Sequence, residues 1–341
     1  MKSRLTLREL PHVTPGEWDD LISRYPNDTV FHSSSWHQAL NECLPGEVRR
    51  FQIEQDGQTC GHWCGFMVTK FGLKVFGAPL PGTATDYMYP LFVSAPPVVD
   101  FLDAVRAWAT AGGVSMIDLG GEYLDDVTLL SQGYRVRHTR TYRVDLSGGE
   151  DAVWRRLKPA MRNKVRKAEK SGVTIEQDTS PAFAPSFFKM LQAVFRRQNK
   201  VPTYGLRRIE SVVRLLQGSG RLIPLVALRN GEPLASMILL LDRRTAYYWA
   251  GASYETAYPF GANDLLQWRA LQLSVARGIT VYDACGGGDY KEKFGGTFVT
   301  LPGGHLTLHH VVGWLRTSVE KGFRARQALL GAMQRISGSR G

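Results

Sequence analysis

Apolar residues recur with helical spacing at several points in the first half of the chain. Trp18 follows Pro15, a common first residue of helices, and the stretch 98–111 places apolar side chains at i, i+4, i+7 and i+11. Between these two predicted helices, an Asp56-Gly57 turn joins two alternating segments, which predicts a β-hairpin. A short apolar segment, VSMIDL, follows the second helix and predicts a strand.

The second half of the chain repeats this order of elements. Two apolar strands flank an Asn230-Gly231 turn, a third strand reads TAYYWAGAS, and a helix expected at about 261–277 leads to the strand ITVYDA. Aligning the two halves places Asp118 over Asp283, each shortly before a glycine-rich turn. The pattern predicts a mixed α/β fold in which one unit of hairpin, helix and further strand is used twice.

The length of 341 residues suits two domains. We place the boundary at the Ser147-Gly148-Gly149 turn, which gives an N-terminal domain of residues 1–147 and a C-terminal domain of residues 148–308. Residues 309–341 are predicted to form a C-terminal helix with apolar side chains on one side. Packing of this helix on the first domain is favoured over contact with a membrane surface, and both remain open.

A strongly basic segment lies at the start of the second domain. Residues 154–172 contain eight Lys and Arg against one acid, Glu169, in a chain whose net charge is +11. Met161, Val165 and Ala168 have helical spacing and are predicted to face inward, which leaves the basic side chains outside. Such a surface suits a phosphorylated substrate, a nucleic acid or an anionic lipid surface, although a solvated helix face has the same pattern.

Composition excludes several classes of protein. No run of about 18 apolar residues is present, so no membrane-spanning helix is expected. The N-terminus lacks the apolar region of a signal peptide, which makes the cytoplasm the expected compartment. Four cysteines in 341 residues do not form a disulfide framework. Cys60, His62 and Cys64 share one strand face by alternation, but no fourth ligand is apparent, so ordinary packing is favoured and no metal is expected.

The segment YDACGGGDYKEKFGG, residues 282–296, runs from a strand into three consecutive glycines and two lysines, Lys291 and Lys293. Glycines let a ligand approach the backbone, and the lysines supply charge for an anion. The segment is not a Walker A loop, because no Gly-Lys-Ser or Gly-Lys-Thr follows the glycines. It also lacks the second βαβ unit and the acidic ribose ligand of a dinucleotide-binding fingerprint.

Four segments of the second half together resemble a known family. RNKVRKAEKSGV, YYWAGAS, the helix beginning GANDLLQWRAL, and YDACGGGDYKEKFGG occur in an order and spacing similar to the Fem-type transferases and their acyltransferase cousins, both in the GNAT-related superfamily. The resemblance implies two tandem GNAT-like α/β domains with mixed sheets flanked by helices. It also implies a C-terminal helix that packs back on the first domain. Two such domains agree with the internal repeat.

The resemblance further implies acyl transfer. Fem-type enzymes move an amino acid from aminoacyl-tRNA onto a peptidoglycan precursor, and their cousins in exopolysaccharide clusters are thought to move an acyl group from acyl-CoA onto a sugar or amine. We therefore expect an acyl- or aminoacyl-transferase that acts on an amine or hydroxyl of a cell-envelope precursor. No bound cofactor is expected, and acyl-CoA and aminoacyl-tRNA are alternative co-substrates.

The resemblance assigns roles to particular residues. Lys291, after an aromatic residue in the family's motif, is the catalytic candidate for contacting a phosphate or the oxyanion, with a surface lysine as the alternative. Asp283 is the candidate for orienting an amine or accepting a proton, with a turn cap as the alternative. Arg197 is expected to pair with a phosphate or carboxylate. The other expected substrate-binding residues are Lys293, Tyr290, Tyr204, Trp249, Asn263 and Arg162.

Some of these assignments have simpler alternatives. Strand aromatics such as Trp249 are more often core residues, and Asn263, near a helix start, is a candidate cap. The rival for the whole chain is a non-catalytic protein whose basic helix binds RNA or an anionic membrane. A basic helix that faces the cleft beside Lys291 favours a substrate role, and one that faces away favours a docking surface.

The expected partner is an anionic small-molecule or lipid-linked precursor, since the basic segment and the resemblance both favour an anion. Binding of tRNA and peripheral contact with the inner face of the membrane are left open. The sequence predicts no oligomeric state.

Overall fold

The computed structural model describes residues 5–70 and 72–309. In this part of the chain, residues 5–139 and 300–309 form one compact unit, unit 1, and residues 140–299 form a second, unit 2. The divisions fall inside two strands, β7 (Arg135–Asp145) and β13 (Thr297–Thr307).

The domain boundaries expected from the sequence, 147/148 and 308/309, lie just after the ends of β7 and β13. The expected C-terminal helix lies, apart from its first residue, outside the described residues. Among the helices that the structure describes, none is both long and apolar enough to cross a membrane.

Unit 1 is built on a mixed sheet in which the strands follow the order β1-β2-β3-β4-β6-β13, with β5 paired to β3. Its remaining strands are β1 (Leu5–Glu9), β2 (Glu47–Gln55), β3 (Gln58–Lys70), β4 (Leu73–Ala78), β5 (Leu91–Phe92) and β6 (Val114–Gly120). Its helices are α1 (Pro15–Ile22), the 3₁₀ turn η1 (Val30–His32), α2 (Ser34–Cys43), α3 (Val98–Ala111) and α4 (Asp126–Ser131).

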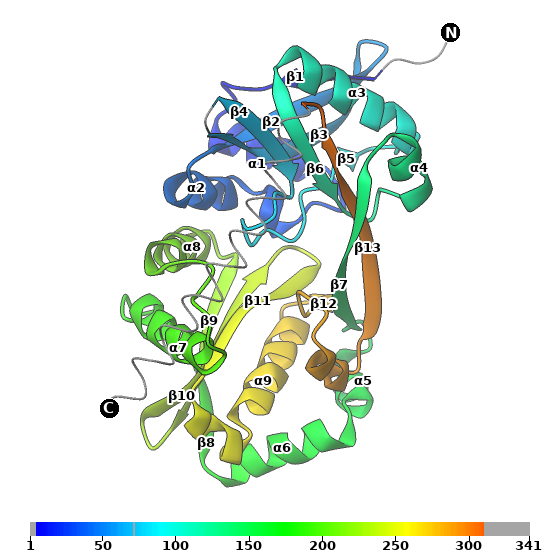
Figure 1. Cartoon of the computed structure of the whole chain (residues 1–341). Coiled ribbons are helices and arrows are strands. Elements are labelled where there is room, and N and C mark those ends of the chain that lie inside the picture. Colours follow the sequence, from blue (N-terminus) through cyan, green and yellow to red (C-terminus); the bar gives the residue numbers. More distant parts are fainter. Residues whose placement is uncertain (1–4, 71, 310–341) are drawn as a thin grey trace. The chain divides into compact units, whose positions relative to one another are not determined.

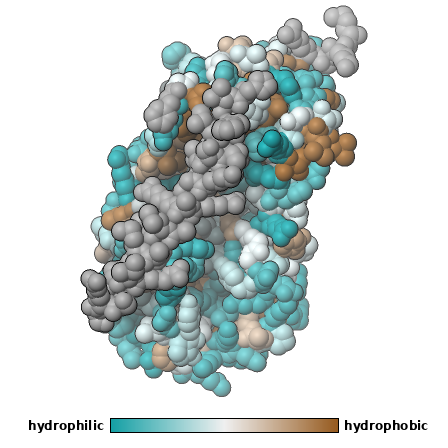
Figure 2. All heavy atoms as spheres, viewed as in Figure 1, coloured by the Kyte–Doolittle hydropathy of each residue, from teal (hydrophilic) through white to brown (hydrophobic). Residues whose placement is uncertain are grey.

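The helix starts of unit 1 follow from local sequence. Thr14 accepts a hydrogen bond from the backbone N–H of Glu17, and the Glu17 carboxylate accepts one from the N–H of Thr14, so a capping box begins α1 at Pro15. The helix expected at 98–111 and the Asp56-Gly57 hairpin are confirmed. In Figure 2, a hydrophobic area lies at the edge where Figure 1 shows α4, whose Val127 is exposed.

Unit 2 is also built on a mixed sheet, in the order β7-β12-β11-β10-β9-β8 (Figure 1). Its remaining strands are β8 (Val173–Gln177), β9 (Leu222–Arg229), β10 (Glu232–Leu241), β11 (Thr245–Ser253) and β12 (Val281–Asp283). Its helices are α5 (Gly149–Arg156), α6 (Pro159–Lys170), α7 (Phe183–Arg197), α8 (Leu206–Gly218) and α9 (Ala262–Ala276), with the 3₁₀ turns η2 (Glu255–Phe260) and η3 (Asp289–Phe294).

The core of unit 2 explains which helices cover which face of its sheet. Alternate residues of β10, among them Met237 and Leu239, pack in one cluster with Leu265 and Trp268 of α9. Helices α7 and α8 cover the other face (Figure 1). The basic helix α6 buries Met161 with its apolar stripe, as predicted, and packs against α9.

The internal repeat predicted from the sequence is confirmed by the strand register. In unit 1, β4 pairs with β6 in parallel and places Gly77 opposite Asp118. In unit 2, β11 pairs with β12 in parallel and places Tyr247 opposite Asp283. The next strand is antiparallel in both units, β13 beside β6 and β7 beside β12. The fold is therefore the expected mixed α/β arrangement of two similar units.

Candidate functional site

A cavity of about 310 Å³ opens in unit 2. Helices α7 and α9, strands β10 and β11, and the turns η2 and η3 contribute to its walls. Its lining residues are Val194, Arg197, Gln198, Ser236, Met237, Tyr248, Gly251, Ala252, Ser253, Tyr258, Asn263, Leu266, Gln267, Tyr290, Lys293 and Phe294. Four of the residues expected at the site, Arg197, Lys293, Tyr290 and Asn263, are thus brought together.

The cavity forms where two parallel strands part. Pairing of β11 with β12 ends at Tyr247 and Asp283, while β11 continues to Ser253 and lines the cavity. The register of β11 on β10 shifts at a bulge between Tyr248, which pairs with Leu239, and Ala250, which pairs with Ile238. Bulges re-aim side chains at strand ends, and here Tyr248 lines the cavity.

Two cations lie at this cavity, and each is held by neighbouring side chains. Arg197, the last residue of α7, donates from Nη2 to the Tyr258 hydroxyl at 2.9 Å and lies over that ring at 5.4 Å from its centroid. Its Nε is 3.7 Å from a carboxylate oxygen of Glu255. Lys293 donates to Asp264 at 2.6 Å. These cations are oriented by their partners, which suits recognition of an anionic group.

Asn263 contributes its side chain to the cavity rather than to the helix start. The N-cap of α9 is Gly261, which has a left-handed backbone with φ of 71°. The Asn263 amide donates instead to the Ser253 hydroxyl at 3.1 Å. The alternative of a helix cap is therefore wrong for Asn263.

Sequence reasoning missed several residues of the cavity, including Gln267 and Tyr258. Gln267 follows Asn263 by four residues, so a polar pair on one face of the predicted helix was the available signal. Tyr258 carried no comparable signal, because it lies in a loop whose 3₁₀ turn the spacing did not predict. Asp264, the partner of Lys293, is buried at the start of α9.

Lys291 is not among the residues that line this cavity, and it is not a surface lysine. It is 7% exposed and donates from Nζ to the carbonyl oxygen of Ala284 at 2.6 Å and to that of Cys285. The chain reaches this arrangement because Cys285 and Gly286 both adopt positive φ. In this conformation, Lys291 holds the glycine-rich loop closed.

Asp283 is fully buried at the end of β12. Its Oδ1 accepts hydrogen bonds from the Thr141 hydroxyl at 2.5 Å and from the backbone N–H of Cys285 at 2.8 Å. Its Oδ2 accepts from Arg143 Nε at 3.1 Å. Asp118 of unit 1 is likewise buried and accepts from Arg137 at 2.6 Å. This geometry matches the turn-capping alternative.

The remaining expected site residues lie outside the lining of the cavity. Tyr204 and Trp249 stack on each other with ring centroids 5.6 Å apart, and burial raises the pKa of Tyr204 to about 12. Arg162 donates to the carbonyl oxygen of Arg155 at 3.3 Å. No residue of α6 lines the cavity.

The three alternating residues of β3 form other contacts. The hydroxyl of Tyr25 and Nδ1 of His62 lie 2.7 Å apart, and the Cys60 thiol donates to the carbonyl of Ile53 at 3.5 Å. Cys64 is buried, and burial raises the pKa of its thiol. Within residues 5–70 and 72–309, no cluster of three or more His, Cys, Asp and Glu side chains could hold a metal ion.

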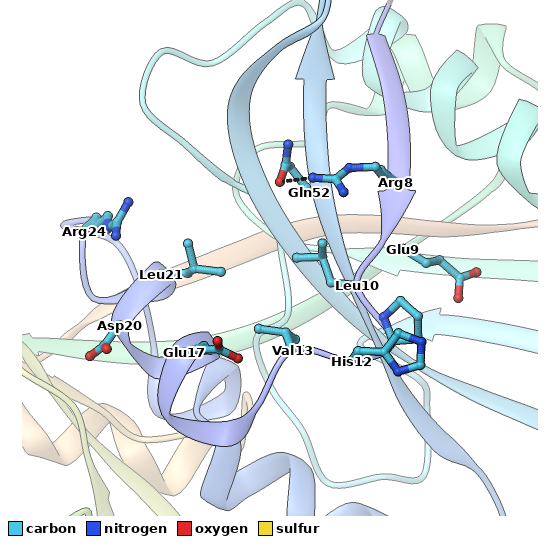
Figure 3. Close-up of a pocket in the computed structure, with 11 residues that line it drawn as sticks. Arg8, Glu9, Leu10, His12, Val13, Glu17, Asp20, Leu21, Arg24 and Gln52 are labelled. Carbon is cyan, nitrogen blue, oxygen red and sulfur yellow. Dashed lines mark hydrogen bonds between the residues drawn. The ribbon is translucent and has the colours of Figure 1, made fainter.

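A second cavity, of about 570 Å³, lies in unit 1 between β1, β2 and α1 (Figure 3). Its lining contains side chains of both charges, with Arg8 and Arg24 beside Glu9, Glu17 and Asp20. Two of these groups are already engaged by their neighbours. Arg8 donates to Gln52 at 2.7 Å, the dashed contact in Figure 3, and Glu17 caps α1. None of the expected site residues lies there.

Comparison with known proteins agrees with this geometry. Residues 155–293, which include most of the cavity lining, match the family model of an acetyltransferase (GNAT) domain. The crystal structure of FemX is similar over 90% of this chain and 99% of its own, with a TM-score of 0.69 and 14% identity. No curated protein matches the sequence.

Two further solved structures have the same fold. A tandem GNAT protein from the clavulanic acid biosynthesis pathway is similar over 89% of this chain and 98% of its own, with a TM-score of 0.52 and 11% identity. The C-terminal domain of a proposed lysylphosphatidylglycerol synthetase from Agrobacterium fabrum covers 85% of this chain and 92% of its own, with a TM-score of 0.51 and 14% identity. At such identities the similarity establishes the fold, that of a FemX-like tandem GNAT protein.

Proposed function

From a FemX-like fold with a GNAT domain at residues 155–293, we propose that this protein is an acyl- or aminoacyl-transferase whose acceptor is an amine or hydroxyl of a cell-envelope precursor. The observation that carries the proposal is the cavity of unit 2. It places two oriented cations, Arg197 and Lys293, beside the amide and hydroxyl groups of Asn263 and Tyr290.

Acyl transfer needs bound reactants in a fixed orientation and stabilisation of the oxyanion that forms at the carbonyl carbon. Arg197 and Lys293 supply positive charge for a phosphate or carboxylate of either reactant. Asn263 and the tyrosines supply neutral hydrogen-bond partners that fix orientation without adding charge. The apolar side chains of Val194, Met237 and Leu266 provide the less polar wall that accommodates an acyl chain or side chain.

Both candidate donors, acyl-CoA and aminoacyl-tRNA, carry phosphates, so the cations of the cavity are compatible with either. The FemX-like fold favours a peptidoglycan precursor as the acceptor, and an exopolysaccharide precursor is the second candidate. No bound cofactor enters this proposal. Action in the cytoplasm or at the inner face of the membrane remains a prediction.

A specific observation favours a second role for unit 2. Residues 140–299 contain 25 Lys and Arg against 14 Asp and Glu, so they carry the whole net charge of +11. The exposed basic side chains of α6 do not line the cavity, and they include Lys164, Arg166 and Lys167. We propose that this face binds tRNA or an anionic membrane surface, either as an aid to transfer or, as the alternative function, without catalysis.

One experiment separates transfer from binding alone. Purified protein is incubated with a panel of acyl-CoAs and aminoacyl-tRNAs together with lipid-linked and nucleotide-linked envelope precursors, and acceptors are analysed by mass spectrometry. A mass increment of one acyl or aminoacyl group establishes transfer and identifies the donor. Tight binding of tRNA or of vesicles with phosphatidylglycerol, with no increment from any donor, would support the binding protein instead.

A further inference from the structure

Six basic side chains of unit 2 lie on the solvent side of α6 and at the end of α5, and we call this surface the basic face of α6. They are Arg155, Arg162, Lys164, Arg166, Lys167 and Lys170. Arg162 is half-buried and the others are exposed. The opposite stripe of α6 is buried in the core of unit 2 through Met161, Val165 and Ala168. The helix, which runs along the lower edge of unit 2 in Figure 1, therefore presents its charge to solvent.

Neighbouring carboxylates do not neutralise these cations. In the part of the chain that the structure describes, none of the six side chains takes part in an ion pair. Arg156 differs from them, because its guanidinium lies 3.7 Å from a carboxylate oxygen of Asp145. Lys158 likewise pairs with Glu292 at 2.6 Å. The charge of the basic face of α6 is therefore available to a partner that carries many negative charges.

The cations are distributed along the length of the helix. Arg162, Arg166 and Lys170 follow one another at four-residue intervals, so they form a row with members about 6 Å apart along the helix axis. Neither of the two cavities described above includes a residue of α6. A row of cations on the outer side of one helix can contact a flat anionic surface along its whole length.

The basic face of α6 offers no ring on which the bases of an RNA could stack. Proteins that bind single-stranded RNA use exposed aromatic side chains for this purpose. Among the described residues of unit 2, the exposed aromatic side chains lie on other elements and are Tyr258, Tyr290 and Phe298. Trp154 of α5 is half-buried, with the ring of Trp268 at 4.7 Å and the guanidinium of Arg166 at 5.5 Å from its own ring. A surface of cations alone suits lipid headgroups better than bases.

The basic face of α6 also has no apolar side chain that could enter a bilayer. Within the described residues, the large aliphatic side chains that are exposed all belong to unit 1 and are Val93, Val99, Val127 and Leu130. Helices that lie in a membrane surface insert an apolar face, whereas the apolar stripe of α6 is already buried in unit 2. Contact through this face is therefore electrostatic and is weakened by salt.

The start of α6 and its centre are fixed to the walls of the cavity. The backbone N–H of Lys158 donates to the carbonyl oxygen of Lys293 at 3.0 Å. A Cβ atom at Gly261, the N-cap of α9, would lie 2.7 Å from the carbonyl oxygen of Lys164. These contacts connect α6 to η3 and to the start of α9, which contribute Lys293 and Asn263 to the cavity. A surface that binds α6 thus also fixes the position of the cavity.

We propose that the basic face of α6 docks unit 2 on the anionic surface of a lipid bilayer, with the phosphate headgroups of lipids such as phosphatidylglycerol as its ligands. The purpose of this docking rests on the proposed function, because a lipid-linked precursor is presented at such a surface. Each Lys or Arg close to an anionic bilayer raises the binding constant about fivefold. Several such residues without an inserted apolar group give reversible binding.

Sedimentation with vesicles tests the docking on the full chain. Purified protein is mixed with vesicles of phosphatidylcholine that contain one-third phosphatidylglycerol, or with vesicles of phosphatidylcholine alone. We expect binding to the anionic vesicles only, and its loss at about 1 M NaCl, where the Debye length is about 3 Å. Equal binding to both kinds of vesicle, or binding that salt does not weaken, would overturn the proposal.

A charge-neutralised variant tests whether α6 is the docking surface. The triple variant Arg166→Gln, Lys167→Gln and Lys170→Gln is expected to lower the binding constant for anionic vesicles about 100-fold. The matched control removes three exposed cations from α7 and the residues that follow it, Lys189→Gln, Arg196→Gln and Lys200→Gln. Both variants have the same net charge, and α7 covers the other face of the sheet. Equal losses in the two variants would show that net charge alone attracts the vesicles.

Bulk tRNA is the competing partner in the same assay. If the α6 variant binds vesicles like the wild type and loses affinity for tRNA instead, the face binds RNA and the proposal is wrong. The mass-spectrometric panel tests the proposed function separately. Transfer by a wild-type protein that does not bind vesicles would overturn the docking and leave the proposed function intact. Binding to vesicles through α6 without transfer from any donor would support the docking and contradict the proposed function.

Discussion

The ammonium nitrogen of Lys291 lies 2.6 Å from the carbonyl oxygen of Ala284, inside the glycine-rich loop that follows β12. The same group also donates to the carbonyl of Cys285. Because the ammonium group of Lys291 donates to two backbone oxygens, Lys291 stabilises the loop. Since Tyr290 directly precedes Lys291, closing the loop also places Tyr290 at the cavity.

Lys291→Met is therefore expected to lower the free energy of unfolding by about 1.5–3 kcal/mol, because the carbonyls of Ala284 and Cys285 lose a charged donor and the first of these contacts is buried. Urea denaturation measures the change. Lys167→Met is the matched control, since Lys167 is exposed on α6 and its replacement should cost little. If Lys291 acts only on substrate phosphate, the variant would keep full stability and lose donor binding.

Gly295→Ala is expected to destabilise unit 2 more than Gly172→Ala. Both glycines have φ of 75°, so an added side chain meets the same backbone strain of about 1–2 kcal/mol at either position. At Gly295 a Cβ atom would also overlap the carbonyl group of Arg156, whereas at Gly172 no atom lies within 4 Å. Thermal unfolding of the two variants gives the comparison, and equal losses would contradict the close packing at Gly295.

The local elements of this fold could be predicted from the sequence because their signals are local. The apolar residues that predict the helix 98–111 all lie within that segment, and the structure has the helix at Val98–Ala111. The helix expected at about 261–277 is α9, which spans Ala262–Ala276. The repeat was visible because both units place an aspartate at the end of the strand that follows the helix. Each of these features depends on residues close together in the chain.

The site was less predictable because its contacts join distant residues. Arg197 and Tyr258 are 61 positions apart, and Arg143 and Asp283 are 140 apart. A lysine is usually exposed, so the sequence gives no sign that Lys291 is buried. Its burial depends on the positive φ of Cys285 and Gly286, which brings the carbonyls of Ala284 and Cys285 to its ammonium group. The motif thus pointed to a loop that contributes Tyr290 and Lys293 to the cavity, whereas the internal hydrogen bonds of Lys291 needed the three-dimensional arrangement.

Acid is expected to destabilise unit 1 through its buried histidines. Burial lowers the pKa of both His32 and His62 from 6.5 to about 4. His32 is held neutral, with Nδ1 accepting from the N–H of Thr29 at 3.1 Å and Nε2 facing the Tyr89 carbonyl at 2.9 Å. The folded chain therefore binds fewer protons than the unfolded chain between these pH values.

The stabilisation from these histidines is complete above pH 6.5 and falls as the pH drops toward 4, by up to about 1.4 kcal/mol per pH unit for each group. Denaturant unfolding at a series of pH values measures this slope. His32→Gln should make the slope shallower, whatever its effect at pH 7. An unchanged slope in this variant would show that His32 does not titrate as the structure indicates.

Lys293 and Asp264 are expected to behave as a coupled pair. The Asp264 side chain is 6% exposed and that of Lys293 is 26% exposed, so Lys293→Ala leaves a buried carboxylate without its cation. The expected loss is about 1.5–3 kcal/mol. Adding Asp264→Asn should recover part of it, and a double-mutant cycle by urea unfolding measures the coupling. Strictly additive losses would argue against the pair.

The central claim is that transfer takes place in the cavity of unit 2 and that the basic face of α6 serves only for docking. The most direct test compares kcat and KM of Arg197→Ala and Arg166→Ala with the donor and acceptor found by mass spectrometry. Both changes remove one arginine from unit 2, but only Arg197 lines the cavity. We predict that Arg197→Ala lowers kcat/KM by about 10²-fold, and that Arg166→Ala keeps kcat and alters at most KM at raised salt. A loss of kcat in Arg166→Ala with full activity of Arg197→Ala would contradict the account.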